Sequence, residues 1–166
     1  MPNDRYFEFA DGILVRLDRV RVLESSVRYP HSTDEVENAT EEHSTQIMIR
    51  ETRDGFAVSV SWSLFVSNRE APFVKIVVLV EFSTIGFEKL FSVAESGALV
   101  SLTPVDRNLI MTAYSTMRGV AAVAVNGTPW STRLPSLRSV ADLLPTNASS
   151  AADAELPRAE SDSIDG

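Results

Sequence analysis

The sequence predicts an α+β fold, in which a four-stranded antiparallel sheet carries a long and a short C-terminal helix on one face. Over much of residues 13–82, apolar residues recur at every second position, which is the period of a half-buried strand. Beyond residue 103 they recur every three or four positions, which is the period of a helix. Because the strands come first and are joined by turns, we expect antiparallel pairing.

The first strand is expected over Ile13–Tyr29, where imperfect alternation fits one bulged strand or two short ones. The next two, Gln46–Arg53 and Phe56–Val66, flank Asp54-Gly55, a pair that favours a two-residue type I′ turn. A fourth strand is expected over Phe73–Phe82. The turns between them predict successive hairpins.

The last two strands differ in the face that they turn away from the expected core. In Phe56–Val66 the apolar positions include Trp62, which we expect in the core, and serines occupy most positions between them. In Phe73–Phe82 the second face mixes charges with Val77 and Leu79. A cluster of apolar side chains on a solvated sheet face indicates a contact surface.

A long helix is expected from Pro104 to about Asn126. Thr103 is a suitable N-cap, and proline is favoured at the first helical position. Gly127 suits the C-cap. The pair Asn126-Gly127 could instead form a hairpin turn, but the helical period upstream favours the cap.

Several segments are expected outside the sheet and the long helix. A connector, Thr128–Ser136, leads to a short final helix near Leu137–Leu144. The acidic stretch Pro30–Glu42 is expected to be a solvated loop between strands. From Thr146 to Gly166 the chain has almost no apolar side chains to bury, so we expect a folded domain over residues 1–145 and a disordered acidic tail.

The composition excludes several classes of function. The net charge of −8 argues against binding to nucleic acid or to an anionic membrane, because both need clustered Lys and Arg. The absence of cysteine excludes disulfides, thiol catalysis and Cys-ligated metal. No apolar run approaches the length of a membrane helix, and the N-terminus lacks the pattern of a signal peptide. We therefore expect a cytoplasmic protein.

The sequence contains no recognisable catalytic motif, so we expect a protein that is not an enzyme and uses no cofactor or metal. Both histidines, His31 and His43, fall in or beside the acidic loop, where they could bind a metal loosely but are expected to be solvated side chains. Glu41 and Glu42 are likewise expected to be solvated loop residues and not convergent groups of a pocket.

Aromatic and methionine side chains offer adaptable apolar contact area for varied partners. Four of them are candidate binding residues: Phe65 on a strand, Tyr114 and Met117 on the long helix, and Trp130 in the connector. The alternative is ordinary core packing. Trp130 is the most open case because connectors lie at the surface.

Several short strings, in order and near the expected spacing over Ile13 to Leu144, resemble the SecB family of export chaperones. They are the strand Val15–Val20 with Leu23-Glu24, then Leu79-Val80-Glu81 and Ile85-Gly86-Phe87, then Asn108-Leu109, Tyr114 to Arg118, Gly127-Thr128 and Leu134-Pro135.

The resemblance implies a subunit of four strands and two helices that assembles as a dimer of dimers. It also implies binding of unfolded preproteins in apolar grooves, with Tyr114 in the groove, and transfer to the SecA motor. The positions that match the SecA contact are Glu24, Leu79 and Glu81. The sequence departs from the family at the acidic stretch Thr33–Glu42 and at Arg28, which occupies an acidic position.

Three functional hypotheses follow. The first is a holdase that binds unfolded polypeptides without ATP. The second is an adaptor dedicated to one partner, such as an antitoxin or a phage or secretion component. The third is a small-ligand binding protein or an enzyme with a pocket between sheet and helices, which a convergent set of polar residues would support.

Overall fold

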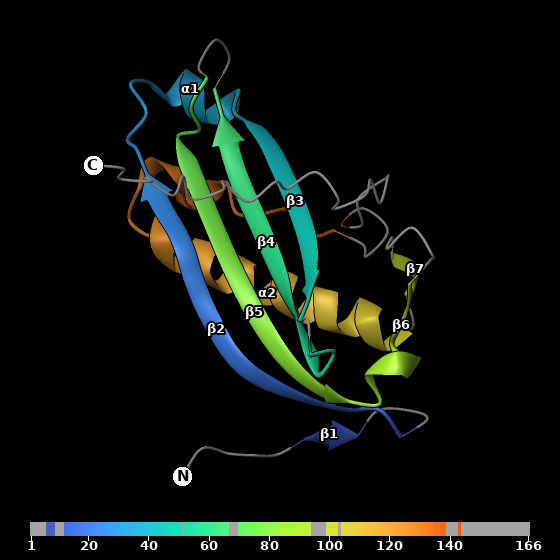
Figure 1. Cartoon of the computed structure of the whole chain (residues 1–166). Coiled ribbons are helices and arrows are strands. Elements are labelled where there is room, and N and C mark those ends of the chain that lie inside the picture. Colours follow the sequence, from blue (N-terminus) through green and yellow to red (C-terminus); the bar gives the residue numbers. More distant parts are fainter. Residues whose placement is uncertain are drawn as a thin grey trace, which may run out of the picture.

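The computed structural model describes residues 6–8, 12–50, 52–66, 70–93, 99–102, 104–138 and 143. Five strands form one sheet, two more form a separate pair, and one long helix lies behind the sheet (Figure 1). The elements are β1 (Phe7–Glu8), β2 (Leu14–Val27), α1 (Thr33–Glu37), β3 (Thr40–Ile49), β4 (Gly55–Phe65), β5 (Val74–Ile85), η2 (Phe87–Lys89), β6 (Phe91–Val93), β7 (Leu99–Leu102), α2 (Pro104–Val125) and η3 (Pro129–Thr132).

The large sheet has the strand order β1-β2-β5-β4-β3, and all of its pairs are antiparallel. Strands β3, β4 and β5 follow one another as hairpins, whereas β2 pairs with β5. The chain must therefore cross the end of the sheet between β2 and β3, and α1 lies on this crossing (Figure 1). The α+β class and the four long strands match the prediction, but β1 adds a fifth strand, and the β6–β7 pair was not predicted.

The alternation in β2 is imperfect because the strand contains two bulges. Its register against β5 shifts between Leu17 and Arg19, and again between Val22 and Glu24. Each extra residue reverses the phase of the side chains that follow. Val20 therefore keeps its side chain on the same face as Leu17. Of the two alternatives that the sequence left open, one bulged strand or two short ones, the structure has the single bulged strand.

The turn between β3 and β4 differs from the expected two-residue hairpin. Strand β3 ends at Ile49, and the positive φ of 53° belongs to Arg53 and not to Gly55. A Cβ atom on Gly55 would lie 2.2 Å from the carbonyl oxygen of Phe82. Glycine is required here because β4 begins in close contact with the backbone of β5. The described residues of the turn are Arg50 and Thr52 to Asp54, and the amide of Arg50 donates to the carbonyl oxygen of Gly55.

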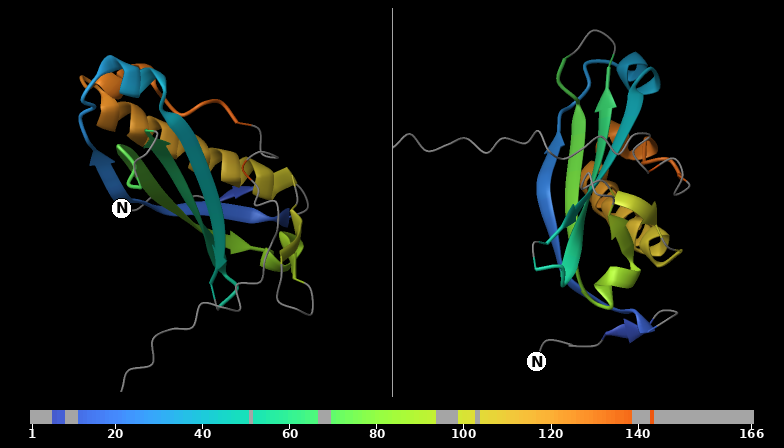
Figure 2. Two further views of the ribbon diagram at one scale, coloured as in Figure 1. Left: turned by 90° about the horizontal axis from the view of Figure 1, so that it is seen from above. Right: turned by 45° about the vertical axis from the view of Figure 1, so that its right-hand side comes forward.

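Helix α2 packs against one face of the sheet, and the two views of Figure 2 agree on this placement. It contacts β4 and β5 more than β2. Between helix and sheet lie the buried aromatic and aliphatic side chains, including Trp62, as predicted. The helix begins at Pro104, and Gly127 adopts the positive φ of a C-cap two residues after its end. Thr103, the expected N-cap, lies outside the described residues. No helix in the described part of the chain is both long and apolar enough to cross a bilayer.

Two predicted segments are wrong in part. Pro30–Glu42 is not a continuous loop, because it contains α1 and the start of β3; Ser32 caps α1 through a hydrogen bond from the amide of Glu35. The final helix does not begin at Leu137, since residues 133–138 are neither helix nor strand. Of its remaining residues only Leu143 is described, and it is helical, as predicted, and buried. The predicted tail, 146–166, and the boundary at residue 145 lie outside the described residues.

Candidate functional site

An apolar strip of β2 remains exposed although it belongs to the face that carries α2. Leu17, Val20 and Val22 are 47, 42 and 48% exposed. Their register partners on β5 are Phe82, Val80 and Val78, all of which are buried. The difference arises because α2 lies over β4 and β5 and leaves the inner face of β2 largely uncovered.

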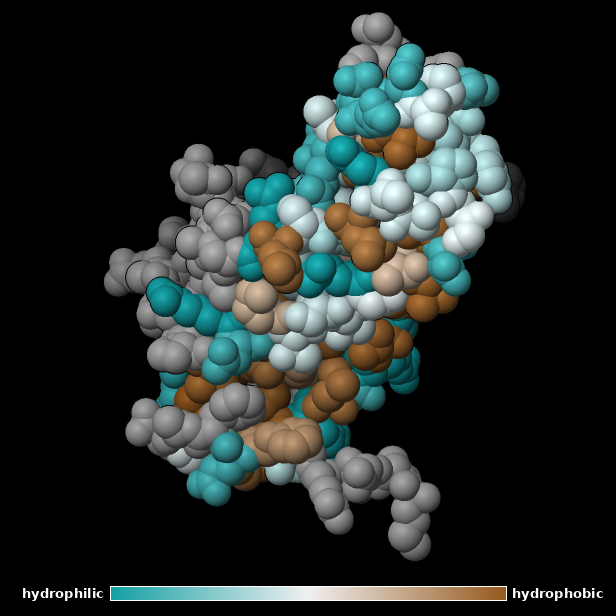
Figure 3. All heavy atoms as spheres, turned by 180° about the vertical axis from the view of Figure 1, so that it is seen from behind, coloured by the Kyte–Doolittle hydropathy of each residue, from teal (hydrophilic) through white to brown (hydrophobic). Residues whose placement is uncertain are grey.

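A groove runs between this strip and α2. Its walls are almost entirely apolar or small side chains, and Val123 on the helix is 79% exposed. The lining residues are Val22, Ser25, Thr116, Gly119, Val120, Val123 and Ala124. Figure 3 shows this side of the molecule, where hydrophobic residues (brown) reach the surface beside residues of intermediate hydropathy (white). Exposed apolar surface of this kind marks a contact site for another polypeptide.

Strand β2 also has a long open edge. Strand β1 pairs only with Leu14 and Val15, so among the described residues no strand covers β2 from Arg16 to Val27 on that side. An open edge presents unpaired backbone N–H and C=O groups, to which an extended chain can add. The groove and the edge therefore adjoin along one strand.

The outer surface of α2 carries very little charge. From Asn108 to Asn126 the only charged residue is Arg118, and its Nε donates to the carbonyl oxygen of Pro135 at 3.0 Å. Within the helix Gly119 has no atom within 4 Å of where a Cβ would lie. A mid-helix glycine costs about 1 kcal/mol relative to alanine, and no packing within the described part of the chain requires this one.

Three of the predicted binding residues are core residues in this structure. Tyr114, Met117 and Trp130 are at most 1% exposed. The expected exposure of Trp130 is wrong because η3 turns its ring inward, against Phe73. The fourth, Phe65, is half-buried and lies on the face of the sheet that α2 does not cover.

The polar atoms of the buried rings have partners inside the fold. The indole Nε1 of Trp130 donates to the backbone carbonyl oxygen of Arg28 at 2.6 Å. The hydroxyl of Tyr114 donates to the backbone carbonyl oxygen of Ser136, also at 2.6 Å. These bonds tie the connector after α2 to the start of the crossing and to the helix. Because their polar atoms are hydrogen-bonded inside the fold, these two aromatic side chains contribute to core packing.

A polar cluster that the sequence did not reveal lies on the inner face of β3. One carboxylate oxygen of Glu41 accepts hydrogen bonds from His43 Nε2 at 2.6 Å, Trp62 Nε1 at 3.0 Å and the amide of Ser136 at 2.8 Å. Because the carboxylate only accepts, the ring of His43 donates from Nε2. Glu41 and His43 were expected in a solvated loop, which is wrong because β3 begins at Thr40. Glu42 is exposed, on the opposite face.

Burial and charge shift both titrating groups of this cluster. Burial raises the pKa of Glu41, but hydrogen bonds from Ser136 and the attraction of His43 outweigh it and leave that pKa below its ordinary value. Burial lowers the pKa of His43, and repulsion from Arg138 adds to this, while Glu41 opposes it in part. The Nδ1 atom of His43 is buried and has no hydrogen-bond partner among the described residues. The ring of His43 packs beside that of Tyr114, with the two ring centroids 5.7 Å apart.

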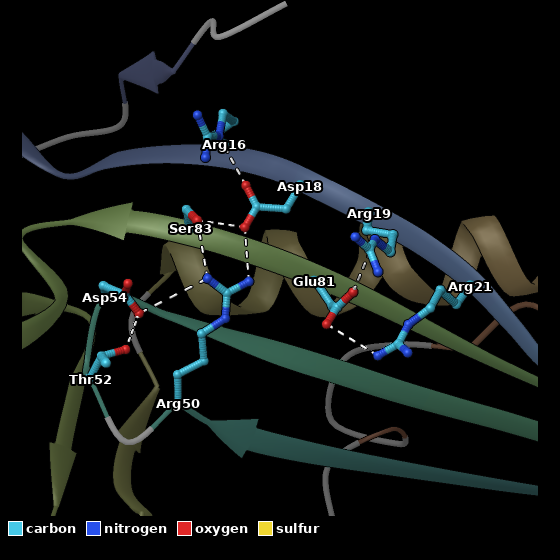
Figure 4. A network of polar contacts seen from close by, with 9 residues as sticks. All are labelled: Arg16, Asp18, Arg19, Arg21, Arg50, Thr52, Asp54, Glu81 and Ser83. Atoms are coloured by element: carbon cyan, nitrogen blue, oxygen red, sulfur yellow. Dashed lines mark hydrogen bonds and ion pairs between the residues drawn. The ribbon is translucent and has the colours of Figure 1, made fainter. Parts of the chain in front are cut away.

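The three residues predicted to contact a SecA-like motor lie on the outer face of the sheet. Strand register places Glu24, Leu79 and Glu81 on that face together. Leu79 is buried by its neighbours, and Glu24 pairs with Lys75 at 2.8 Å. Glu81 lies between two arginines of β2 (Figure 4). Both acidic side chains are therefore ion-paired within the chain.

The site residues that sequence reasoning missed are the strip Leu17, Val20 and Val22, and Val123 and Gly119 on α2. The alternation in the sequence correctly places the strip in a strand. The alternation does not indicate which strands of the sheet the helix would cover. Within the described ranges no three His, Asp or Glu side chains gather where they could hold a metal ion.

Comparisons with known proteins yield one similar solved structure. No family model matches the chain, and no curated protein does. The chain is similar to a SecB-like chaperone. That protein is Rv1957 of Mycobacterium tuberculosis, solved in complex with a ChAD peptide from the antitoxin HigA1. The TM-score is 0.43 and the identity 12%, over 74% of this chain and 83% of that one.

Proposed function

We propose that this protein is an ATP-independent chaperone of the SecB type, which binds unfolded polypeptides in the cytoplasm and turns over no substrate. One observation supports the proposal most: the apolar strip of β2 and the groove beside α2 remain open in an otherwise well-packed molecule. The family strings in the sequence support the same function independently.

The geometry suits an extended client segment. Its backbone would pair with the open edge of β2, and its alternate apolar side chains would contact Leu17, Val20 and Val22. Such contacts depend on backbone groups and apolar area, so they select weakly for sequence. The net charge of −8 would keep a protein with exposed apolar surface in solution.

The same surface could also join copies of the chain, since the resemblance implies a homo-oligomer built as a dimer of dimers. The open edge of β2 and the uncharged face of α2 suit contacts between subunits. Native mass spectrometry of the full chain, over a range of concentrations, measures this directly.

The test is suppression of aggregation of a chemically denatured client by the full chain. Wild type at stoichiometric excess should suppress aggregation, and Val22→Asp with Val123→Asp should abolish suppression at unchanged native mass. Met48→Asp is the control, because Met48 is similarly exposed but lies on the opposite face. No suppression by wild type would contradict the function. Lost assembly with intact suppression would instead identify the groove as a subunit interface.

A dedicated adaptor for one partner, such as an antitoxin or a phage or secretion component, is the alternative. One observation favours it over general export. The acidic residues expected to contact SecA are ion-paired within the chain, Glu24 with Lys75 and Glu81 with Arg21. Affinity capture from the native host separates the two, because one dominant partner supports the adaptor and many unfolded clients support the holdase.

A further inference from the structure

On the outer face of β2 and β5, arginines flank two carboxylates, Glu81 and Asp18, and reach further into solvent than these two acids do. Glu81 lies between Arg21, whose Nη2 is 3.2 Å from one carboxylate oxygen, and Arg19, whose Nε is 3.9 Å from the other. Asp18 lies between Arg16 and Arg50, at 2.9 and 2.8 Å. Figure 4 shows the two groups side by side along β2 and β5.

The charged groups differ in how far they reach the surface. The side chains of Arg19 and Arg21 are 66 and 45% exposed, whereas those of Glu81 and Asp18 are 20 and 19% exposed. At Glu81 an approaching molecule therefore meets the guanidinium groups of Arg19 and Arg21 before it meets the carboxylate. Two nearby acids are more exposed, and each is paired with a cation: Asp54 with Arg50 and Glu24 with Lys75. Four arginines surround Glu81 and Asp18, in a chain whose net charge is −8.

The first bulge of β2 creates this surface. Asp18 is the extra residue of this bulge. Without it, Arg19 and Arg21 would point toward α2, and Val20 and Val22 would point outward. The bulge places the arginines on the outer face and the valines beside the groove. A hydrogen-bonded network holds the bulge, because Asp18 accepts from Ser83 and from Arg50 Nη2. Burial raises the pKa of Asp18, but these bonds and those from Arg16 outweigh it and keep the pKa low.

We propose that the outer face around Arg19 and Arg21 is a second docking surface, which binds an acidic segment of a partner polypeptide. Each guanidinium has five N–H donors, and Glu81 engages only part of them. The remaining donors can bind carboxylates of the partner in the bidentate geometry that arginine favours. Charge complementarity selects the partner, since a basic segment would meet the arginines first and be repelled.

This surface is separate from the proposed client groove, because it lies on the other side of the sheet. The inference therefore does not depend on holdase activity. A SecA-like contact made by Glu24 and Glu81 would prefer a basic partner, whereas this surface is predicted to prefer an acidic one. Serines of β4 on the same face, Ser59 and Ser61, add hydroxyl groups without adding negative charge.

The experiment measures fluorescence anisotropy of labelled decaglutamate with the full chain at low and at physiological salt. Wild type should bind, and Arg19→Glu with Arg21→Glu should weaken binding about tenfold. The control is Arg28→Glu with Arg107→Glu, which changes net charge equally at two exposed arginines outside the Glu81 and Asp18 clusters. Arg19→Gln with Arg21→Gln, which adds no negative charge, should weaken binding by a smaller factor.

Two results would overturn the proposal. One is an equal loss in both charge-reversed doubles, which would mean that net charge alone governs binding. The other is undiminished binding by the Arg19→Glu, Arg21→Glu protein. Circular dichroism and aggregation suppression of the same variants should be unchanged, so failure of this surface is distinguishable from failure of the chaperone function.

Discussion

A carboxylate oxygen of Glu41 accepts a hydrogen bond from the indole Nε1 of Trp62 at 3.0 Å. The bond crosses from β3 to β4, and the same oxygen also accepts from the amide of Ser136. One side chain thus joins the edge of the sheet, its central core tryptophan and the segment that follows η3. This role makes Glu41 a structural residue despite its acidic neighbours in the sequence.

Replacing Glu41 by alanine should destabilise the fold by about 3 kcal/mol, because three buried donors lose their acceptor. Urea unfolding measures the change. Glu42→Ala is the matched control, since Glu42 is exposed on the opposite face and should change stability by less than about 0.5 kcal/mol. Equal costs for the two substitutions would show that the cluster does not hold the segment.

The stability of the protein should fall as the pH drops below 6.5, the ordinary pKa of histidine. His43 has a lower pKa in the fold, so below this pH the unfolded chain binds a proton that the folded chain resists. The contribution of Glu41 is present above its ordinary pKa of 4.5 and is lost as the pH falls through its lower folded value. Unfolding free energies from about pH 7.5 to 5.5 should show this decline, and His43→Gln should flatten it. An unchanged slope in that variant would contradict the assignment.

The paired valines Val22 and Val78 should respond differently to truncation. They are register partners, but Val78 is fully buried and Val22 is largely exposed. Val78→Ala should cost about 2 kcal/mol, whereas Val22→Ala should cost less than about 0.5 kcal/mol. Denaturant unfolding at a concentration where native mass shows the monomer gives both values. Similar costs would mean that the strip of β2 is covered in solution.

Glu81→Lys should leave the protein folded, because the side chain lies on an uncovered sheet face. The substitution places a third cation beside Arg19 and Arg21, so we expect a loss of about 1 kcal/mol. It should also strengthen binding of an acidic peptide to this face. Thermal unfolding and anisotropy check the two effects, and weaker acidic-peptide binding would contradict the charge argument.

The fold class follows from local patterns, because alternation and helical period depend on neighbouring residues. The core position of Trp62, the bulged first strand and the end of the long helix near Gly127 were all predictable. The pairing of β2 with β5 was not, since it brings together residues far apart in the sequence. The turn at Gly55 was misassigned because the glycine is needed for contact with β5 rather than for positive φ.

The candidate site was less accessible to sequence reasoning. Aromatic type predicted Tyr114, Met117 and Trp130 as contact residues, but large rings are also what a core needs, and these three are buried. The exposed strip of β2 has the same sequence pattern as a covered strand. Only the lateral position of α2 on the sheet distinguishes the two, and that position depends on packing across the whole core.

The most direct test of the account is hydrogen exchange of the full chain with and without an unfolded client. The account predicts slower exchange at β2 between Arg16 and Val27, with little change at the amides of β3. Protection confined to other elements, or none at a client concentration that suppresses aggregation, would contradict it.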